Sequence, residues 1–255
     1  MPDPQPLALT AARVAGVWGL DLGAPFAGSN YSYVAPTGRG AVLKVRAPDD
    51  VESQHEANAL ELWGGDGAVR LLRQSPADRA LLLERAMPGD DLAALPDERA
   101  TTIAVEVARR LWLPAGDPFR WIGELVGPWL DEAERAAGQS SELIGLAREL
   151  YDSLAPGRGV LVHGDLHHHN LLDTGDRYVA IDPKPMLGEP EFDVPPFLWN
   201  PIGHELTASG TRRRMAAFAA AGLDEGRMRA WAVIRAAYLG VVDEREAGIL
   251  RGLVA

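Results

Sequence analysis

The 255-residue sequence contains no cysteine, which excludes disulfide bonds and metal sites built on thiolates. It also lacks any apolar run of the roughly 18 residues that a membrane-spanning helix requires. The first ten residues, MPDPQPLALT, have neither a basic segment nor an apolar core, so they do not resemble a secretory signal. These absences predict a protein without a membrane partner.

Basic residues are also scarce, with 25 Lys and Arg against 36 Asp and Glu, and the net charge is −11. A negative charge disfavours nucleic acid as a partner, and it is compatible with a cationic small-molecule substrate. Solubility is the simpler explanation of the acidity. The length allows one large domain or two lobes, and we expect a monomer or a weak dimer.

The most informative stretch is 160–182, which reads VLVHGDLHHHNLLDTGDRYVAID. An apolar strand leads into Asp165, Asn170 follows five residues later, and a hairpin then leads to Asp182. This order of acid, amide and acid is the one that phosphotransfer sites use for a base and two magnesium ligands. We expect Asp165 to accept the proton of a hydroxyl. We expect Asn170 and Asp182 to bind Mg²⁺, because hard cations take oxygen ligands.

A charged pair upstream fits the same chemistry. Lys44 lies in the middle of the apolar strand 41–45, where a charge is unexpected unless it faces a phosphate. Glu56 follows twelve residues later in a predicted helix, on the same face as Leu60 and Trp63. We expect Glu56 to face inward and to hold Lys44 in place.

Two further segments are candidates for binding ATP. The turn formed by Gly28, Ser29 and Asn30 could present backbone N–H groups to the phosphates. The segment that begins at Glu84 and ends at Ala86 could form backbone hydrogen bonds with the adenine edge. Neither segment alone is specific, and the turn does not match the full Gly-rich pattern of kinases.

Three consecutive histidines, His167, His168 and His169, leave a zinc site open as an alternative. Neighbouring loop residues point in different directions, so three in a row are poorly arranged to bind one ion, and no helical i, i+4 pair supports them. We expect His163 to be a structural hydrogen-bonding residue beside the loop of Asp165.

The sequence also predicts the order of secondary structure. Strands are expected at 20–26, 31–35, 41–45, 69–72 and 80–84, with helices at 11–18 and 48–63. Segment 87–91 marks a boundary. Beyond it, helices are expected at 101–112, 141–154, 211–221, 224–242 and 244–254, with a mostly non-helical loop over 183–201.

At these residues the chain resembles the aminoglycoside phosphotransferase family, which shares the protein-kinase-like fold. The stretch HGDLHHHN, which begins at His163, is similar to that family's catalytic loop, where Gly replaces the Arg usual in protein kinases. Asp182 is followed by Pro-Lys-Pro, then by GEP from Gly188 and FDV from Phe192. This pattern, with segments 18–26 and 41–45, is similar to the streptomycin 6-phosphotransferase and hydroxyurea-kinase branch.

The resemblance implies an α+β fold with two lobes. Residues 1–87 are expected to form a small nucleotide-binding lobe, an antiparallel sheet with one helix, and the hinge is expected near 84–91. Residues 88–255 are expected to form a larger, mostly helical catalytic and substrate-binding lobe. The implied activity is ATP- and Mg²⁺-dependent phosphorylation of a hydroxyl on an aminoglycoside such as streptomycin, in the cytoplasm.

The same resemblance implies roles for single residues. Asp165 is the base, Asn170 and Asp182 are the magnesium ligands, and Lys44 with Glu56 positions the phosphates. Asp193 resembles the buried acid that steadies the catalytic loop, and Lys184 is near enough to a metal-binding Asp to reach a phosphate.

A streptomycin-like acceptor carries guanidinium groups, which favour carboxylates and aromatic faces. The architecture implied by the resemblance puts the acceptor pocket between the catalytic loop and the closing helices. The candidate residues are Glu189, Glu191, Trp199, Asn200, His204, Glu205, Trp231, Asp243 and Glu244. Trp231 also fits a buried helical stripe with Ile234 and Tyr238, which is the commoner role for such a residue.

Two other functions remain open at this point. A related kinase could phosphorylate a sugar or another metabolite, and a catalytically silent protein could bind nucleotide on the same fold. The base and both metal ligands argue against the silent form.

Overall fold

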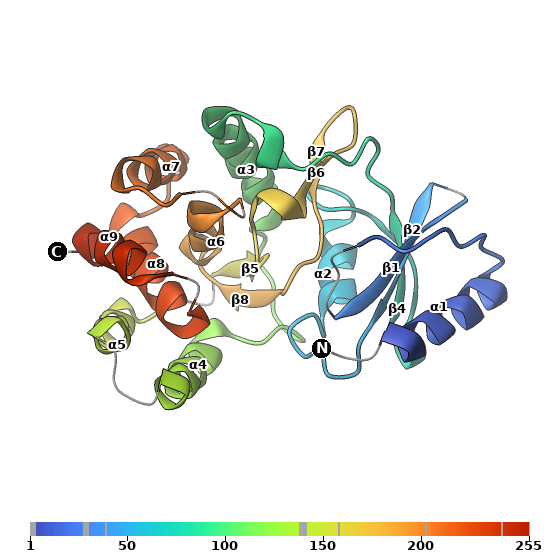
Figure 1. Cartoon of the computed structure of the whole chain (residues 1–255), viewed down its shortest axis with the longest axis horizontal. Helices are drawn as coiled ribbons and strands as arrows, with labels where there is room; N and C mark the ends of the chain where they lie inside the picture. The colour runs from blue at the N-terminus through green and yellow to red at the C-terminus, as the bar shows by residue number, and fades with distance from the viewer. Residues whose placement is uncertain are drawn as a thin grey trace. The chain divides into compact units, whose positions relative to one another are not determined.

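The computed structural model describes residues 4–27, 31–38, 40–137, 142–157, 159–201, 203, 205–240 and 242–254. The chain forms two compact units (Figure 1). The first unit consists of Met1–Asp90 and Leu172–Lys184, and the second of Asp91–Leu171 and Pro185–Ala255.

The first unit is built on a four-stranded antiparallel sheet. Its strands lie in the order β1 (Ser32–Thr37), β2 (Ala41–Arg46), β4 (Ala80–Glu84) and β3 (Leu71–Ser75). Helix α1 (Pro4–Trp18) packs on β2 (Figure 1). Leu7, Ala11 and Val14 of the helix share a core cluster with buried side chains of the strand. The short helix α2 (Glu56–Trp63) lies between β2 and β3 in the sequence and contacts β3.

A segment from late in the sequence completes this unit. The hairpin of β6 (Leu171–Asp173) and β7 (Tyr178–Ala180) returns to it. Val69 N donates to Ala180 O at 3.0 Å, and Ala180 N donates to Gly67 O at 2.8 Å. These backbone bonds explain why 172–184 belongs with the first unit, whereas the sequence predicted one uninterrupted second lobe from residue 88 onward.

The second unit is mostly helical. It contains α3 (Asp97–Leu111), α4 (Ile122–Ala137), α5 (Glu142–Leu154), α6 (Val194–Trp199), α7 (Ala208–Ala220), α8 (Glu225–Leu239) and α9 (Glu244–Val254). The strands β5 (Val160–Val162) and β8 (Met186–Gly188) form a small antiparallel pair. Helix α8 is central, because it contacts α4, α5, α6, α7 and α9 (Figure 1). Trp231, Val233 and Ile234 of α8 are fully buried.

Several expected elements differ from those observed. Segment 20–26 is not a strand, although Leu22 forms an isolated bridge with Thr37. Gly23 and Pro25 interrupt regular pairing there, since proline lacks a donor. The helix expected at 48–63 begins only at Glu56, after a turn in which Asp50 Oδ1 accepts from Ser53 N at 3.1 Å. Such local side-chain bonds compete with a helix.

Prolines explain two further differences between the expected and the observed secondary structure, one in segment 183–201 and one in segment 122–137. The first segment was expected to be mostly non-helical, yet it contains β8, the 3₁₀ turn Pro190–Asp193 and α6. Pro190, Pro195 and Pro196 occupy the first turns of these helices, where the missing N–H has no intrahelical partner. Helix α4 was not predicted, because Pro128 lies inside it.

In the part of the chain that the structure describes, no helix is both long enough and apolar enough to cross a membrane.

Candidate active site

The first unit contains a buried charged network centred on Lys44. Lys44 lies on β2 opposite Val34 of β1 and Leu81 of β4, and it is 4% exposed. Its Nζ lies 2.7 Å from Glu56 Oε1 and 2.5 Å from Asp182 Oδ1. The structure thus brings together three of the residues that the sequence singled out.

Local structure explains how Glu56 reaches Lys44. Glu56 is the first residue of α2, and it shares a buried face with Leu60 and Trp63. Packing of these apolar neighbours turns the carboxylate inward, where it is 0% exposed. A buried carboxylate needs a cationic partner to remain charged, and Lys44 is that partner.

The network keeps Lys44 protonated. Burial works against the ammonium, yet the carboxylates of Glu56 and Asp182 outweigh it and hold the pKa of Lys44 above its ordinary value. Burial raises the pKa of Glu56, and the charge of Lys44 works against that rise. We take the pair as ionised, because the 2.7 Å contact joins a strong donor to a strong acceptor. A firmly protonated lysine suits a phosphate site.

Asp182 follows β7 in a left-handed backbone conformation, with φ of 56°. A residue with a Cβ adopts this conformation at a cost of about 1–2 kcal/mol, so the surrounding structure must hold it there. Its side chain is 53% exposed even though one oxygen contacts Lys44. Asp182 therefore offers carboxylate oxygen to solvent beside a buried lysine.

Lys184, two residues further along, lies 3.1 Å from Glu52 Oε2 through its Nζ. Both side chains of this ion pair are partly exposed, and Glu52 precedes the first residue of α2 by four positions.

The second unit contains the loop of Asp165, held by Asp193. This carboxylate is fully buried, and it accepts from His163 N at 2.9 Å and Gly164 N at 2.7 Å. Trp112 Nε1 also donates to it, at 3.0 Å. Two backbone amides and an indole thus hold the carboxylate and the strand end together. Gly164 has φ of 83°, a conformation that favours glycine.

Asp165 and Asn170 are joined inside the same loop. Asn170 Nδ2 donates to the backbone oxygen of Asp165 at 2.9 Å. With its nitrogen used as a donor, the amide can offer Oδ1 to a cation. Asn170 in the second unit and Asp182 in the first each offer the oxygen donor that magnesium takes, so the chemistry of each residue by itself fits this metal.

The histidines have other partners in the structure. His163 is fully buried, and its Nδ1 accepts from Asp165 N at 3.2 Å. His167 Nδ1 accepts from His169 N at 3.2 Å, and His169 Nδ1 lies 2.6 Å from Asp91 Oδ2. His168 stacks on Phe197 with ring centroids 4.0 Å apart. Among the described residues, no group of three or more His, Cys, Asp or Glu side chains could hold a metal ion.

The structure describes only some of the other expected nucleotide-binding residues. Gly28, Ser29 and Asn30 lie outside the described residues. Glu84 ends β4, where its backbone N donates to Arg70 O at 2.8 Å and its carboxylate lies 3.4 Å from Arg177 Nη2. Ala86 follows two residues later and is buried.

Several expected acceptor residues have structural partners. Glu189 accepts from Trp231 Nε1 at 2.5 Å and from Arg227 Nη2 at 2.5 Å, and Trp231 is fully buried. Glu191 accepts from Asp224 N at 2.9 Å and so holds the start of α8. Asn200 Nδ2 donates to Pro196 O at 2.9 Å at the end of α6. Glu191 and Asn200 thus bind backbone groups at the ends of α8 and α6, whereas Glu189 binds side chains along α8.

Of the remaining candidates, Trp199 is half-buried on α6, and Glu205 is exposed and pairs with Arg245 at 3.3 Å. His204 lies outside the described residues.

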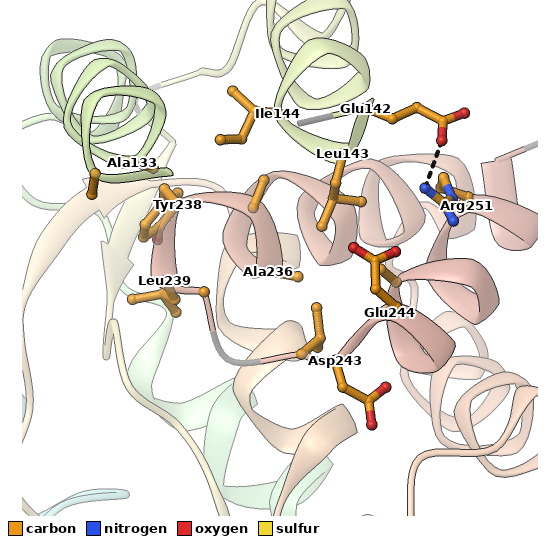
Figure 2. Close-up of a pocket in the computed structure, with 15 residues that line it drawn as sticks. Ala133, Glu142, Leu143, Ile144, Ala236, Tyr238, Leu239, Asp243, Glu244 and Arg251 are labelled. Carbon is orange, nitrogen blue, oxygen red and sulfur yellow. Dashed lines mark hydrogen bonds and ion pairs between the residues drawn. The ribbon is translucent and has the colours of Figure 1, made fainter. Parts of the chain in front are cut away.

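A pocket of about 610 Å³ lies among α4, α5, α8 and α9 (Figure 2). Small apolar side chains such as Ala133, Ala136 and Ala236 contribute to its wall. Glu142, Asp243, Glu244 and Arg251 are its charged lining residues, and Arg251 Nη1 lies 2.9 Å from Glu142 Oε2. Three carboxylates against one guanidinium give the described lining an excess of negative charge.

Sequence reasoning missed Arg235 and Trp112, which also hold the loop of Asp165. Arg235 Nη2 donates to Gly164 O at 2.8 Å, and Trp112 binds Asp193. A signal for Arg235 was present, because it is a single charge inside the apolar run AWAVIRAAYLGVV. A charge in a buried helical stripe indicates a specific polar partner.

Comparison with solved structures identifies the fold class. The structure matches the ternary complex of streptomycin and ATP with APH(2")-IIa at a TM-score of 0.63 and 15% identity, over 95% of this chain and 98% of that chain. The fold is therefore α+β and protein-kinase-like, as predicted.

The sequence defines the family. The chain belongs to the aminoglycoside/hydroxyurea antibiotic resistance kinase family, whose profile matches residues 24–247. It is 35% identical to the hydroxyurea phosphotransferase of Kitasatospora aureofaciens over 86% of this chain and 67% of the relative. It is 31% identical to the streptomycin 6-kinase of Streptomyces glaucescens over 84% of this chain and 75% of the relative. The predicted family is confirmed, and the chain is a phosphotransferase.

Proposed function

We propose that this protein transfers the terminal phosphoryl group of ATP to a hydroxyl of a cationic aminoglycoside, with Mg²⁺ as cofactor and streptomycin as the first candidate acceptor. The network of Lys44, Glu56 and Asp182 carries the proposal. It combines a protonated lysine, a buried carboxylate that fixes it and a partly exposed carboxylate. These are the parts needed to neutralise and orient a nucleoside triphosphate.

The residues of the second unit supply the acceptor side of the reaction. The acceptor hydroxyl oxygen forms a bond to the terminal phosphorus, while the bond from that phosphorus to the bridging oxygen breaks and ADP leaves. Asp165 takes the hydroxyl proton as this bond forms. Asp193 holds the backbone ahead of Asp165, which limits the positions that the base can adopt.

Asn170 and Asp182 would hold Mg²⁺ through their side-chain oxygens. When bound, the ion would neutralise charge on the phosphates. Lys44 would add a fixed positive charge beside Asp182, and the exposed side of the Asp182 carboxylate would remain available to the ion.

The acidic pocket among α4, α5, α8 and α9 is the candidate binding site for the cationic groups of the acceptor, although its described lining includes no residue of the loop of Asp165. Glu142, Asp243 and Glu244 would attract guanidinium or ammonium groups. The streptomycin kinases among the relatives favour the same class of acceptor. Hydroxyurea is the second candidate, because one relative is a hydroxyurea phosphotransferase, but it is neutral and would gain little from an acidic pocket.

A coupled assay of ADP release tests the proposal. The purified full-length protein is given ATP and Mg²⁺ with streptomycin, other aminoglycosides, hydroxyurea or simple sugars in turn. We expect acceptor-dependent ADP release with streptomycin and formation of a phosphorylated product. Nucleotide binding without transfer to any acceptor would contradict the proposal, whereas transfer to a neutral sugar alone would favour a metabolite kinase.

A further inference from the structure

The peptide unit that joins Gly164 to Asp165 is held at both of its polar ends. Its carbonyl, Gly164 O, accepts from Arg235 Nη2 at 2.8 Å. Its amide, Asp165 N, donates to His163 Nδ1 at 3.2 Å. The preceding amide, Gly164 N, donates to Asp193 Oδ1 at 2.7 Å. The backbone leading to the carboxylate of Asp165 is therefore fixed from three directions.

Arg235 is an unusual residue for its place in the fold. It is 4% exposed on α8, next to Ile234 and Ala236 in the buried part of the helix. A guanidinium in such a position is expensive to desolvate unless its donors are used. Within the described residues, Nη1 and Nη2 of Arg235 donate to the backbone oxygens of Phe192, at 3.1 Å, and Gly164, while Nε has no hydrogen-bond partner.

The second bond makes Arg235 a link between two loops. Phe192 directly precedes Asp193, and the guanidinium also lies over the Phe192 ring, 4.2 Å from its centroid. Arg235 thus binds the segment that carries Asp193 and the segment that carries Asp165. Asp193 accepts hydrogen bonds from backbone amides, and Arg235 donates one to a backbone carbonyl. The two residues therefore hold both the N–H and the C=O group of Gly164.

Glycine at position 164 makes this restraint necessary. With φ of 83° and no side chain, Gly164 can rotate more freely than other residues. If its carbonyl lost Arg235, the peptide plane could turn and carry the Asp165 side chain with it. Displacements of about 1 Å at a reacting group can reduce a rate about 100-fold.

We propose that Arg235 is a positioning residue that sets the orientation of Asp165 through the carbonyl of Gly164. This inference rests on the proposed role of Asp165 as the base. The same helix also lines the acidic pocket with its next residues, Ala236 to Gly240. Helix α8 therefore connects the wall of the proposed acceptor site with the backbone of the base.

Arg214 provides a matched control. It is 2% exposed on α7, and its Nη1 donates to the backbone oxygens of Phe197, Leu198 and Asn200. Its Nε also donates to Asp97 at 2.7 Å. Arg214 is thus as buried as Arg235 and makes more hydrogen bonds, and none of them within the described chain goes to residues 163–166; its partner Phe197 does stack on His168, further along the loop.

The test compares R235K and R235Q with R214K in the full-length protein. Lysine keeps the charge but cannot bridge two carbonyls with a planar fork, and glutamine keeps one donor group. We expect kcat to fall about 10- to 100-fold in the Arg235 variants. KM for ATP and acceptor should change less than about threefold, as expected when a transition-state interaction alone is lost. R214K should lose stability and keep its kcat.

Hydrogen exchange of the segment 160–166, which ends before His168, gives a readout that needs no acceptor. We expect faster exchange in R235K than in wild type, and no change in this segment in R214K. If the wild type transfers phosphate to no acceptor, the proposed function fails, while the exchange result still decides whether Arg235 fixes the loop. Equal kcat and equal exchange in R235K and R214K would overturn the inference. If neither Arg235 variant folds while R214K does, the inference is also overturned, because Arg235 would then be required for folding and not for positioning Asp165.

Discussion

Lys44 and Asp182 are 138 residues apart in the sequence, and their side chains meet at 2.5 Å within the first unit. Glu56 completes the contact from the other side of the ammonium, at 2.7 Å. One lysine therefore forms ion pairs with two carboxylates, one fully buried and one half exposed. The stability of the unit and the binding of nucleotide should both depend on this lysine, and the two effects can be separated.

Replacing Lys44 by Met should destabilise the protein, because it leaves the buried Glu56 without its main cation. We expect a loss of about 3–5 kcal/mol in the free energy of unfolding, measured by urea denaturation. The double variant K44M/E56L removes both charges and should regain part of this stability, yet it should still fail to bind ATP. A single variant as stable as wild type would contradict the assigned pairing.

Replacing Asp165 by Ala should remove transfer and spare nucleotide binding. Loss of a general base lowers rates by about 10²- to 10⁴-fold. ADP release measures the rate, and a thermal shift with ATP measures binding, since a ligand of the native state raises stability. Full activity in D165A would show that another group takes the proton.

Removal of divalent metal should stop the reaction. We expect EDTA to abolish ADP release and added Mg²⁺ to restore it. In D182N the concentration of Mg²⁺ needed for half-maximal rate should rise at least about tenfold, because a charged oxygen ligand is lost. An unchanged requirement for Mg²⁺ in D182N would place the metal on other residues.

Neutralising the pocket should weaken binding of a cationic acceptor. In the double variant D243N/E244Q we expect KM for streptomycin to rise about tenfold, with little change in KM for ATP and a weaker dependence of KM on salt. The exposed Glu132 on α4 and Glu149 on α5 do not line the pocket, so E132Q/E149Q, which also removes two charges, is the control for net charge. Equal behaviour of the two variants would exclude this pocket as the acceptor site.

Replacing Trp231 by Phe tests a different assignment. The indole is fully buried and donates to Glu189, so its loss should lower the free energy of unfolding by about 1–3 kcal/mol. KM for every acceptor should stay the same, which enzyme kinetics can check. A rise in KM for the acceptor without loss of stability would indicate that Trp231 and Glu189 contact the acceptor.

Local patterns predicted much of the site. The place of Lys44 inside the apolar strand 41–45 and the helical spacing of Glu56 with Leu60 singled out both residues, and tertiary packing brings their side chains to 2.7 Å. The loop of Asp165 could be located because its polar residues follow a short apolar strand. Both features depend on residues close in the sequence, where spacing determines which side chains share a face.

The features that the sequence did not predict depend on tertiary partners. Glu189 was expected in the acceptor site because an isolated carboxylate suits a cation, but its partners Trp231 and Arg227 come from a helix about 40 residues away. The role of Arg235 required knowing that Gly164 lies against α8. Helix α4 was missed because Pro128 and two glycines weaken its local propensity, while Ile122, Leu125 and Val126 are buried by packing.

The return of Leu172–Lys184 to the first unit has a consequence for protein engineering. A fragment that ends at Asp90 would contain the sheet and Lys44, yet it would lack the strand bonded to Val69 and the carboxylate that shares the lysine. Such a fragment should be a poor stand-alone nucleotide binder. A chimera that exchanges this unit with a homologue should graft two separate stretches of the gene, and a circular permutant that joins them would be the rational route to an isolated unit.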